Sequence, residues 1–199
     1  MFVLGLTGSI GMGKSTAAAM LRRLGVPVHD ADAAVHRVYA QDRGALAEIA
    51  AAFPGRVRDG AIDRQALGAQ VFGDPDARQR LEAILHPRVR ASTRRFLQRY
   101  ARARTPVVAL DIPLLFETGG DRNVDAVLVV SAPAFIQRQR VMARPGMTAE
   151  KFAGILRSQT PNREKRRLAD YVVETGLGKH YTWCALRRIV EALRATATR

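Results

Sequence analysis

One glycine-rich stretch near the start constrains the fold of this chain more than any other. Residues 8–15 read Gly-Ser-Ile-Gly-Met-Gly-Lys-Ser and match the pattern G-x-x-x-x-G-K-[ST]. Residues 2–6 before it are apolar, as in a buried strand, and residues 15–24 after it favour a helix. Glycines there let successive backbone N–H groups face one hollow at the helix N-terminus, which suits the phosphates of a nucleotide.

The pattern assigns roles within this loop. Lys14 is expected to reach the β- and γ-phosphates of ATP, and the Ser15 hydroxyl to bind Mg²⁺. The alternative is a glycine-rich turn with an accidental lysine, which the scarcity of lysine disfavours: the chain has four lysines and 28 arginines. The loop residues expected to hold the nucleotide are Gly8, Ser9, Ile10, Gly11, Met12, Gly13, Lys14, Ser15 and Thr16.

Composition narrows the class of protein. A chain of 199 residues, 47% hydrophobic, predicts one globular domain with insertions, and the single Cys184 excludes an intrachain disulfide. The net charge of +14 is compatible with arginine-rich composition, a polyphosphate substrate or nucleic acid. The arginines are scattered and aromatic residues make up 6%, so we expect no nucleic-acid partner. Without a leader or a long apolar run, we expect a cytoplasmic protein away from membranes. The sequence does not give the oligomeric state, and a monomer is favoured.

Two carboxylates follow a short second strand. Residues 26–29 are predicted to form this strand, and Asp30 and Asp32 come directly after it. In open α/β sheets this edge faces the ligand crevice, where a carboxylate can accept the proton of an attacking hydroxyl. We assign that role to Asp32, although either carboxylate could instead cap the next helix. His36 follows one turn later, as a contact for substrate phosphate or as an exposed helix residue.

Residues 32–103 predict a helical insertion. Helical patterns fill it, with a break at residues 53–60, a kink or helix end at His86-Pro87, and no strand before residue 105. Arg64 and His86 are candidates to contact an anionic substrate, or else solvated surface residues. The nucleotide-binding core is then expected at residues 1–31, 104–136 and 168–199.

The third predicted strand carries a second metal ligand. Residues 106–117 are almost continuously apolar, as in a central parallel strand, and contain Asp111. An acid at this place is expected to hold Mg²⁺ through water. Leu114 and Phe116 are candidates for an apolar wall beside the substrate, and Phe116 could equally be core.

Residues 137–167 predict a helical lid. Two helical segments meet at Pro145-Gly146, and arginines gather near the turn. Closing such a lid could place guanidinium groups on the transferring phosphate, with Arg140 and Arg144 as the candidates. Solvated helix charge is the alternative for each.

These motifs together resemble the dephospho-CoA kinase family over nearly the whole chain. Besides the phosphate loop, the resemblance rests on Asp-Ala-Asp at residues 30–32, Asp63-Arg64, His86-Pro87, Pro-Leu-Leu-Phe-Glu at 113–117 and the stretch 165–172. Two positions depart from the family pattern: Pro145 follows Arg144, and Thr175 rather than asparagine precedes Gly176.

The resemblance implies a fold and a reaction. The fold is a P-loop three-layer α/β/α architecture with a five-stranded parallel sheet, a helical substrate-binding insertion and a helical lid. The reaction is phosphorylation of the ribose 3′-hydroxyl of dephospho-CoA by MgATP, with Asp32 as base and Arg140 at the phosphates. The alternatives are a nucleoside monophosphate kinase and a P-loop switch or nucleic-acid NTPase, and the chain lacks the Asn-Lys-x-Asp signature of GTPases.

Overall fold

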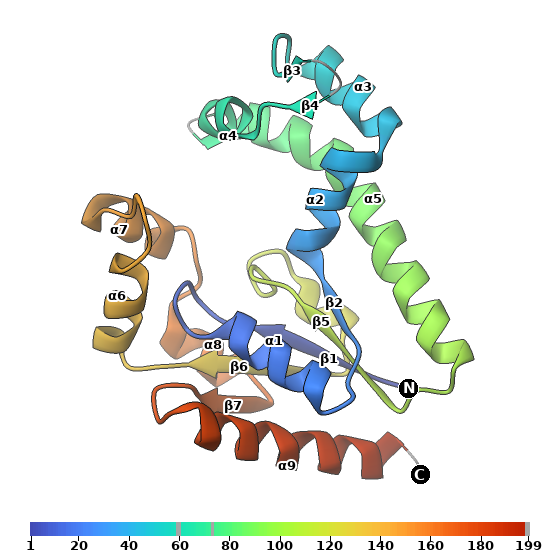
Figure 1. Ribbon diagram of the computed structural model, residues 1–199, viewed down its shortest axis with the longest axis vertical. Coiled ribbons are helices and arrows are strands. Elements are labelled where there is room, and N and C mark those ends of the chain that lie inside the picture. Colours follow the sequence, from blue (N-terminus) through green and yellow to red (C-terminus); the bar gives the residue numbers. More distant parts are fainter. Residues whose placement is uncertain (59–60, 73, 198–199) are drawn as a thin grey trace. The chain divides into compact units, whose positions relative to one another are not determined.

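The computed structural model describes residues 1–58, 61–72 and 74–197 (Figure 1). The chain forms two compact units. The first combines Met1–His29 with Tyr100–Arg199, and the second is Asp30–Arg99. The division of residues 1–199 into core, substrate region and lid stays a prediction.

A five-stranded parallel sheet forms the centre of the first unit. Its order is β2-β5-β1-β6-β7. The strands are β1 (Phe2–Thr7), β2 (Val28–Asp30), β5 (Val107–Asp111), β6 (Ala126–Ser131) and β7 (Tyr171–Glu174). The central strand β1 lies between β5 and β6, with Leu4 beside Ala109 and Ala126. The predicted α/β class with a five-stranded parallel sheet is therefore confirmed.

Helices cover both faces of this sheet. Helices α1 (Lys14–Arg23) and α9 (Lys179–Ala197) lie side by side on one face (Figure 1). Their apolar side chains, among them Leu21 and Leu186, pack against Leu4 and Leu6 of β1 in the main core. On the opposite face, α8 (Asn162–Leu168) contacts β6, and alternate residues of that strand join a second core cluster. Strand alternation thus produces the three layers.

The segment between β6 and α8 is helical. Helix α6 (Ala134–Met142) contacts α7 (Ala149–Arg157), and the short 3₁₀ helix η1 (Gly120–Asn123) precedes β6. The Thr148 hydroxyl accepts a hydrogen bond from the Lys151 amide and so caps α7. Among the described residues, none of the helices combines the length and the apolar character needed to cross a membrane.

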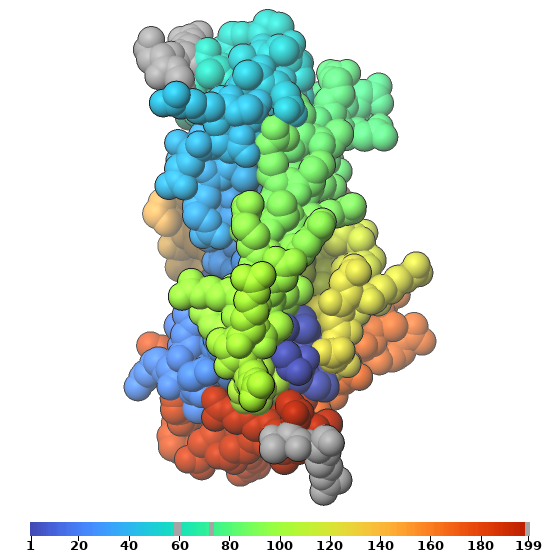
Figure 2. Space-filling view, turned by 90° about the vertical axis from the view of Figure 1, so that its right-hand side faces the viewer, coloured from blue at the N-terminus to red at the C-terminus, as the bar shows by residue number. Residues whose placement is uncertain are grey.

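The second unit is a group of helices around its own core. Its helices are α2 (Ala31–Gln41), α3 (Arg43–Ala52), α4 (Arg64–Phe72) and most of α5 (Pro75–Arg102). Figure 2 shows α2 and α3, in blue and cyan, against the green side chains of α5. Beneath that surface, Phe53, Ile49 and Leu67 are buried in one cluster. Aspartate side chains cap the helices: Asp30, Asp42, Asp63 and Asp74 accept amide hydrogen bonds.

One detail of the predicted helical region is wrong, and one of two alternatives at His86-Pro87 is excluded. The break at residues 53–60 contains a strand, because β3 (Val57–Arg58) pairs antiparallel with β4 (Ala61–Ile62), while residues 59 and 60 lie outside the described part. Pro87 does not end its helix, because it lies inside α5, which is 28 residues long and ends at Arg102. Strands of two residues carry almost no periodic signal, and a single proline removes only one helical hydrogen bond.

Candidate functional site

The glycine-rich loop joins β1 to α1 as predicted. Gly11 and Gly13 adopt the left-handed backbone conformation, with φ of 76° and 87°. A Cβ at Gly11 would lie 2.5 Å from Val141 Cγ2 and 3.0 Å from the Gln137 carbonyl oxygen, so only glycine fits. Gly13 precedes α1 without a side-chain cap. The first amide groups of α1 are therefore not capped by the side chain that precedes them, as an anion site at a helix N-terminus requires.

Lys14 and Asp111 meet at the carboxyl ends of the neighbouring strands β1 and β5. Lys14 Nζ lies 2.5 Å from Asp111 Oδ1. The Asp111 carboxyl is buried, whereas the Lys14 side chain is 19% exposed. An ammonium group partly open to solvent beside a helix N-terminus can bind phosphate oxygens as a point charge.

The donors expected for Mg²⁺ are chemically suited to it. Ser15 is exposed in the first turn of α1, next to Lys14, and Asp111 is bonded to Lys14. A hydroxyl and a carboxylate are oxygen ligands of the hard kind that Mg²⁺ prefers, with nucleotide oxygens and water completing its shell. The residues present therefore fit this ion by donor type.

Two glutamines that the sequence analysis did not single out hold the loop from outside. Gln137 Nε2 of α6 donates to the Ile10 carbonyl at 2.8 Å, and the Ile10 amide donates to Gln159 Oε1 at 3.1 Å. Both polar groups of the Ile10 backbone are thus satisfied by side chains of the segment that follows β6. Hydrogen-bond partners about 130–150 residues apart in sequence leave no local pattern to find.

Arg140 is held beside the same loop. Its Nη1 donates to the Thr175 hydroxyl at 3.0 Å and approaches the Gly11 carbonyl at 3.4 Å, and its Nη2 donates to the Thr175 carbonyl at 2.8 Å. Among the described residues, no carboxylate forms an ion pair with Arg140. Within that part of the chain its charge is therefore not neutralised. Arg144 is exposed just after α6, and no hydrogen bond joins it to the loop in the described part of the chain.

A buried ion pair ties the segment after β5 to α8. Lys165 is fully buried, and its Nζ lies 2.8 Å from Glu117 Oε1. The same oxygen accepts the Thr160 amide at 2.7 Å. Burial by itself would raise the pKa of Glu117, but hydrogen bonds from Lys165, from its own amide and from Thr160 outweigh it and hold the pKa below its ordinary value.

The apolar residues between Asp111 and Glu117 separate into two groups. Leu114 is 41% exposed, while Leu115 is buried and Phe116 packs against the cluster of Leu115, Val127 and Val129. The core interpretation of Phe116 is therefore supported by its packing. A substrate contact for Leu114 and Phe116 stays a prediction.

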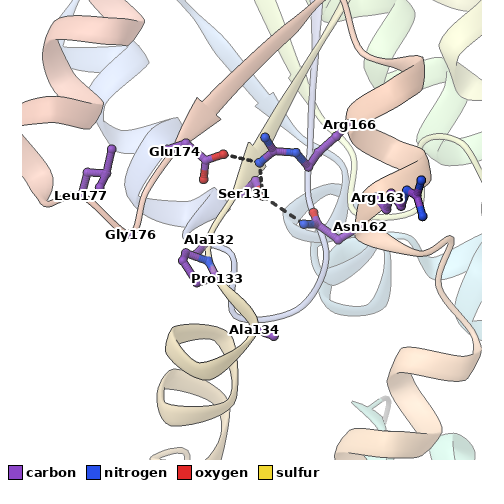
Figure 3. Close-up of a pocket in the computed structure, with 10 residues that line it drawn as sticks. All are labelled: Ser131, Ala132, Pro133, Ala134, Asn162, Arg163, Arg166, Glu174, Gly176 and Leu177. Atoms are coloured by element: carbon purple, nitrogen blue, oxygen red, sulfur yellow. Dashed lines mark hydrogen bonds and ion pairs between the residues drawn. The ribbon is translucent and has the colours of Figure 1, made fainter.

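A pocket of about 470 Å³ opens at the carboxyl ends of β6 and β7 (Figure 3). Its polar side is made by Arg166, which bonds both Ser131 Oγ and Glu174, and by Asn162, whose Nδ2 donates to the same hydroxyl at 3.0 Å. Pro133 and Leu177 line its apolar side. The pocket adjoins the phosphate loop, because the Ala132 amide lies 3.1 Å from Met12 Sδ.

In the second unit Asp30 and Asp32 differ in hydrogen bonding and exposure. Asp30 Oδ1 accepts the Ala33 amide at 2.8 Å and caps α2. Asp32 lies in the first turn of α2 and is exposed. The sequence did not decide which aspartate caps α2, and the structure assigns the cap to Asp30 rather than to Asp32.

Of the predicted substrate contacts on these helices, Arg64 and His36 lie within hydrogen-bond distance of each other, and His86 is not part of this pair. Arg64 Nη1 lies 2.8 Å from His36 Nδ1, and its guanidinium lies 5.8 Å from the centre of the Tyr39 ring. Burial raises the pKa of the Tyr39 hydroxyl, against the opposing effect of the Arg64 charge. His86 is exposed on α5 and is not joined to this cluster by a hydrogen bond in the described residues.

Comparison with known proteins places these features in a family. The dephospho-CoA kinase family model matches residues 2–178. A dephospho-CoA kinase from Paramagnetospirillum magneticum is 66% identical over 83% of this chain and 78% of its own length. One from Mesorhizobium japonicum is 57% identical over 98% of both chains. The crystal structure of TT1252 from Thermus thermophilus is 39% identical, covers 96% of both chains and superposes with a TM-score of 0.84. This chain belongs to the dephospho-CoA kinase family.

Proposed function

We propose that this protein transfers the γ-phosphoryl group of ATP to the ribose 3′-hydroxyl of dephospho-CoA, giving CoA and ADP, the last step of CoA biosynthesis. The observation that carries the proposal is the Lys14–Asp111 pair, 2.5 Å apart beside the uncapped N-terminus of α1, in a chain of this family. A triphosphate cradle is what a kinase of this kind requires.

The first unit supplies the charge stabilisation. Backbone amides of residues 8–16 bind the phosphates, and the Lys14 ammonium follows the β- and γ-oxygens as negative charge shifts to the leaving ADP. Arg140, already fixed beside Gly11, adds a second positive charge on the side of α6. Arg144 is the next arginine along the same segment and is our second candidate for a phosphate contact.

Magnesium would be held by Ser15 and, through water, by Asp111. When bound, the ion neutralises oxygens of the β- and γ-phosphates. The chain's own contribution is to keep the Asp111 carboxylate in place, which its ion pair with Lys14 supports.

We assign the general base to Asp32. It follows the last residue of β2 by two positions, so the chain keeps it close to the carboxyl edge of the sheet, where ligands of such folds bind. Asp30 serves as the cap, which leaves the Asp32 carboxylate available to take the proton from the 3′-hydroxyl as that oxygen attacks phosphorus.

The remaining predicted residues are assigned to binding. His36 and Arg64, joined at 2.8 Å, present a donor-rich group for a phosphate of the acceptor, with His86 as a further contact. Leu114 and Phe116 would line its apolar part. The pocket in Figure 3 is our choice for the base of ATP, because it adjoins the phosphate loop and offers both an apolar wall and hydrogen-bonding groups.

A coupled ADP-release assay tests the function. Dephospho-CoA, AMP and adenosine are offered as competing acceptors with MgATP. We expect dephospho-CoA to have the highest kcat/KM, and the phosphorylated product to be CoA by mass spectrometry. Preferred use of AMP, giving ADP as the phosphorylated acceptor, would instead identify a nucleoside monophosphate kinase. A monomeric state and a cytoplasmic location remain part of the proposal.

A further inference from the structure

We propose that Thr175 is a positioning residue of the nucleotide site, whose hydroxyl sets the direction of the Arg140 guanidinium against the phosphate loop. The inference rests on the proposed function, because it gives Arg140 a role at the phosphates. It concerns a residue outside the phosphate-loop pattern, directly after β7.

Thr175 is a junction between three parts of the first unit. Its amide donates to the Ser131 carbonyl at 2.7 Å, which continues the β6–β7 pairing beyond the strand. Its hydroxyl lies 2.8 Å from the Met12 carbonyl and 3.2 Å from that of Ser131, and it accepts Arg140 Nη1 at 3.0 Å. The residue is 7% exposed, so these bonds do not compete with bulk water.

The direction of the bonds follows from donor counting. A threonine hydroxyl has one proton, and the shorter distance assigns it to the Met12 carbonyl. The oxygen is then free to accept from Arg140, whose charge strengthens the chain of two bonds. Arg140 is thereby connected through one side chain to the loop that would bind phosphate.

The Thr175 side chain is also tightly packed. A Cβ on Gly13 would lie 3.1 Å from Thr175 Oγ1 and 3.2 Å from its Cβ. The side chain therefore packs against Gly13, the residue that precedes α1. Valine has nearly the shape of threonine and would keep this packing while removing both hydroxyl bonds, which makes it the informative substitution.

The experiment is a double-mutant cycle with Thr175→Val and Arg140→Met in the full chain. Initial rates with MgATP and dephospho-CoA are measured together with the affinity for a fluorescent ribose-labelled ATP analogue. In the parent protein we expect Thr175→Val to lower kcat/KM for ATP about tenfold, the effect of losing a hydrogen bond to a charged group. In the Arg140→Met background the same substitution should change it less than about twofold.

Two controls separate positioning from folding. Thr175→Ser keeps the hydroxyl and should restore kcat/KM to within about twofold of the parent. Thr182→Val removes another buried hydroxyl, which bonds the Gly178 carbonyl at 3.0 Å, and should lower Tm while leaving ATP affinity unchanged. An equal loss from Thr175→Val in both Arg140 backgrounds would overturn the proposal, since the hydroxyl would then act only through Met12.

Failure of the proposed function would look different. If the parent protein did not release ADP with dephospho-CoA, that function would be wrong, yet the affinity for the ATP analogue would still test the coupling of Thr175 to Arg140. Conversely, normal turnover of dephospho-CoA with additive effects of the two substitutions would reject only the role of Thr175.

Discussion

In the first unit the charged side chains Lys14, Asp111 and Arg140 of the predicted site have bonding partners within the protein, whereas in the second unit the predicted residues are exposed. Lys14 and Asp111 form an ion pair, Arg140 donates to Thr175, and the backbone of Ile10 is hydrogen-bonded by two glutamines. Asp32 and His86 are exposed. If the proposed function holds, the nucleotide side is preorganised, and the residues assigned to the acceptor become ordered only when it binds.

This contrast predicts that substitutions in the two units fail in different ways. Changes in the first unit should lower both turnover and folding stability, because the groups removed leave buried partners behind. Changes at the exposed site residues of the second unit, such as Asp32 and Arg64, should alter kinetics alone.

The largest effect is expected for Lys14→Ala. The substitution removes a charge that follows the transferring phosphoryl group, and we expect kcat to fall about 10³-fold. It also leaves the buried Asp111 carboxylate without its cation, so Tm should fall as well. Steady-state kinetics and thermal unfolding check both parts, and a variant with normal kcat would remove Lys14 from the mechanism.

Glu117→Gln should be the most damaging change to stability. It leaves Lys165 fully buried and unpaired, and we expect the free energy of unfolding to fall by about 3 kcal/mol, measured by urea denaturation. The matched control is Glu191→Gln, which removes an exposed ion pair with Arg187 and should leave stability unchanged.

The same pair predicts a pH dependence. Because the folded pKa of Glu117 lies below its ordinary value of 4.5, the unfolded chain takes up this proton first as the pH falls. The contribution of the pair is therefore complete above that value and is lost as the pH drops through the folded pKa. Parent and Glu117→Gln stabilities should converge in acid; parallel curves would contradict the assigned pKa.

Asp32→Asn tests the second unit. Loss of the base should lower kcat about 10²-fold while the affinity for ATP and the Tm stay unchanged. The neighbouring Asp30→Asn provides the comparison, because it alters the cap of α2 and should affect Tm more than kcat. If the Asp32 variant turned over normally, that carboxylate would be only a surface charge.

The smallest effect is expected for Arg64→Gln. It removes the guanidinium bonded to His36, and we expect KM for dephospho-CoA to rise about tenfold with little change in kcat, as for one lost phosphate contact. Arg56→Gln is the control, because Arg56 bonds Gln70 instead. Equal KM values for both variants would argue against a binding role for the cluster.

Local sequence patterns were enough to predict the sheet and the phosphate loop. They could not predict hydrogen bonds between residues that lie far apart in the sequence. The apolar runs at residues 2–6 and 106–111, and the glycines of the loop, are strong because each reflects a backbone requirement. Gln137, Gln159 and Thr175 gave no such signal, since their partners lie far away in the sequence. The choice between Asp30 and Asp32 as cap likewise needed the backbone geometry of α2.

Because Lys165 is buried, its chemical reactivity can report when α8 separates from the sheet. An amine-acylating reagent should label the exposed Lys151 and Lys179 quickly, whereas Lys165 can react only when α8 separates from the sheet. With four lysines in the chain, peptide mass spectrometry can follow each one separately. The slow appearance of acylated Lys165 would time the opening of that side of the molecule, without any engineered probe.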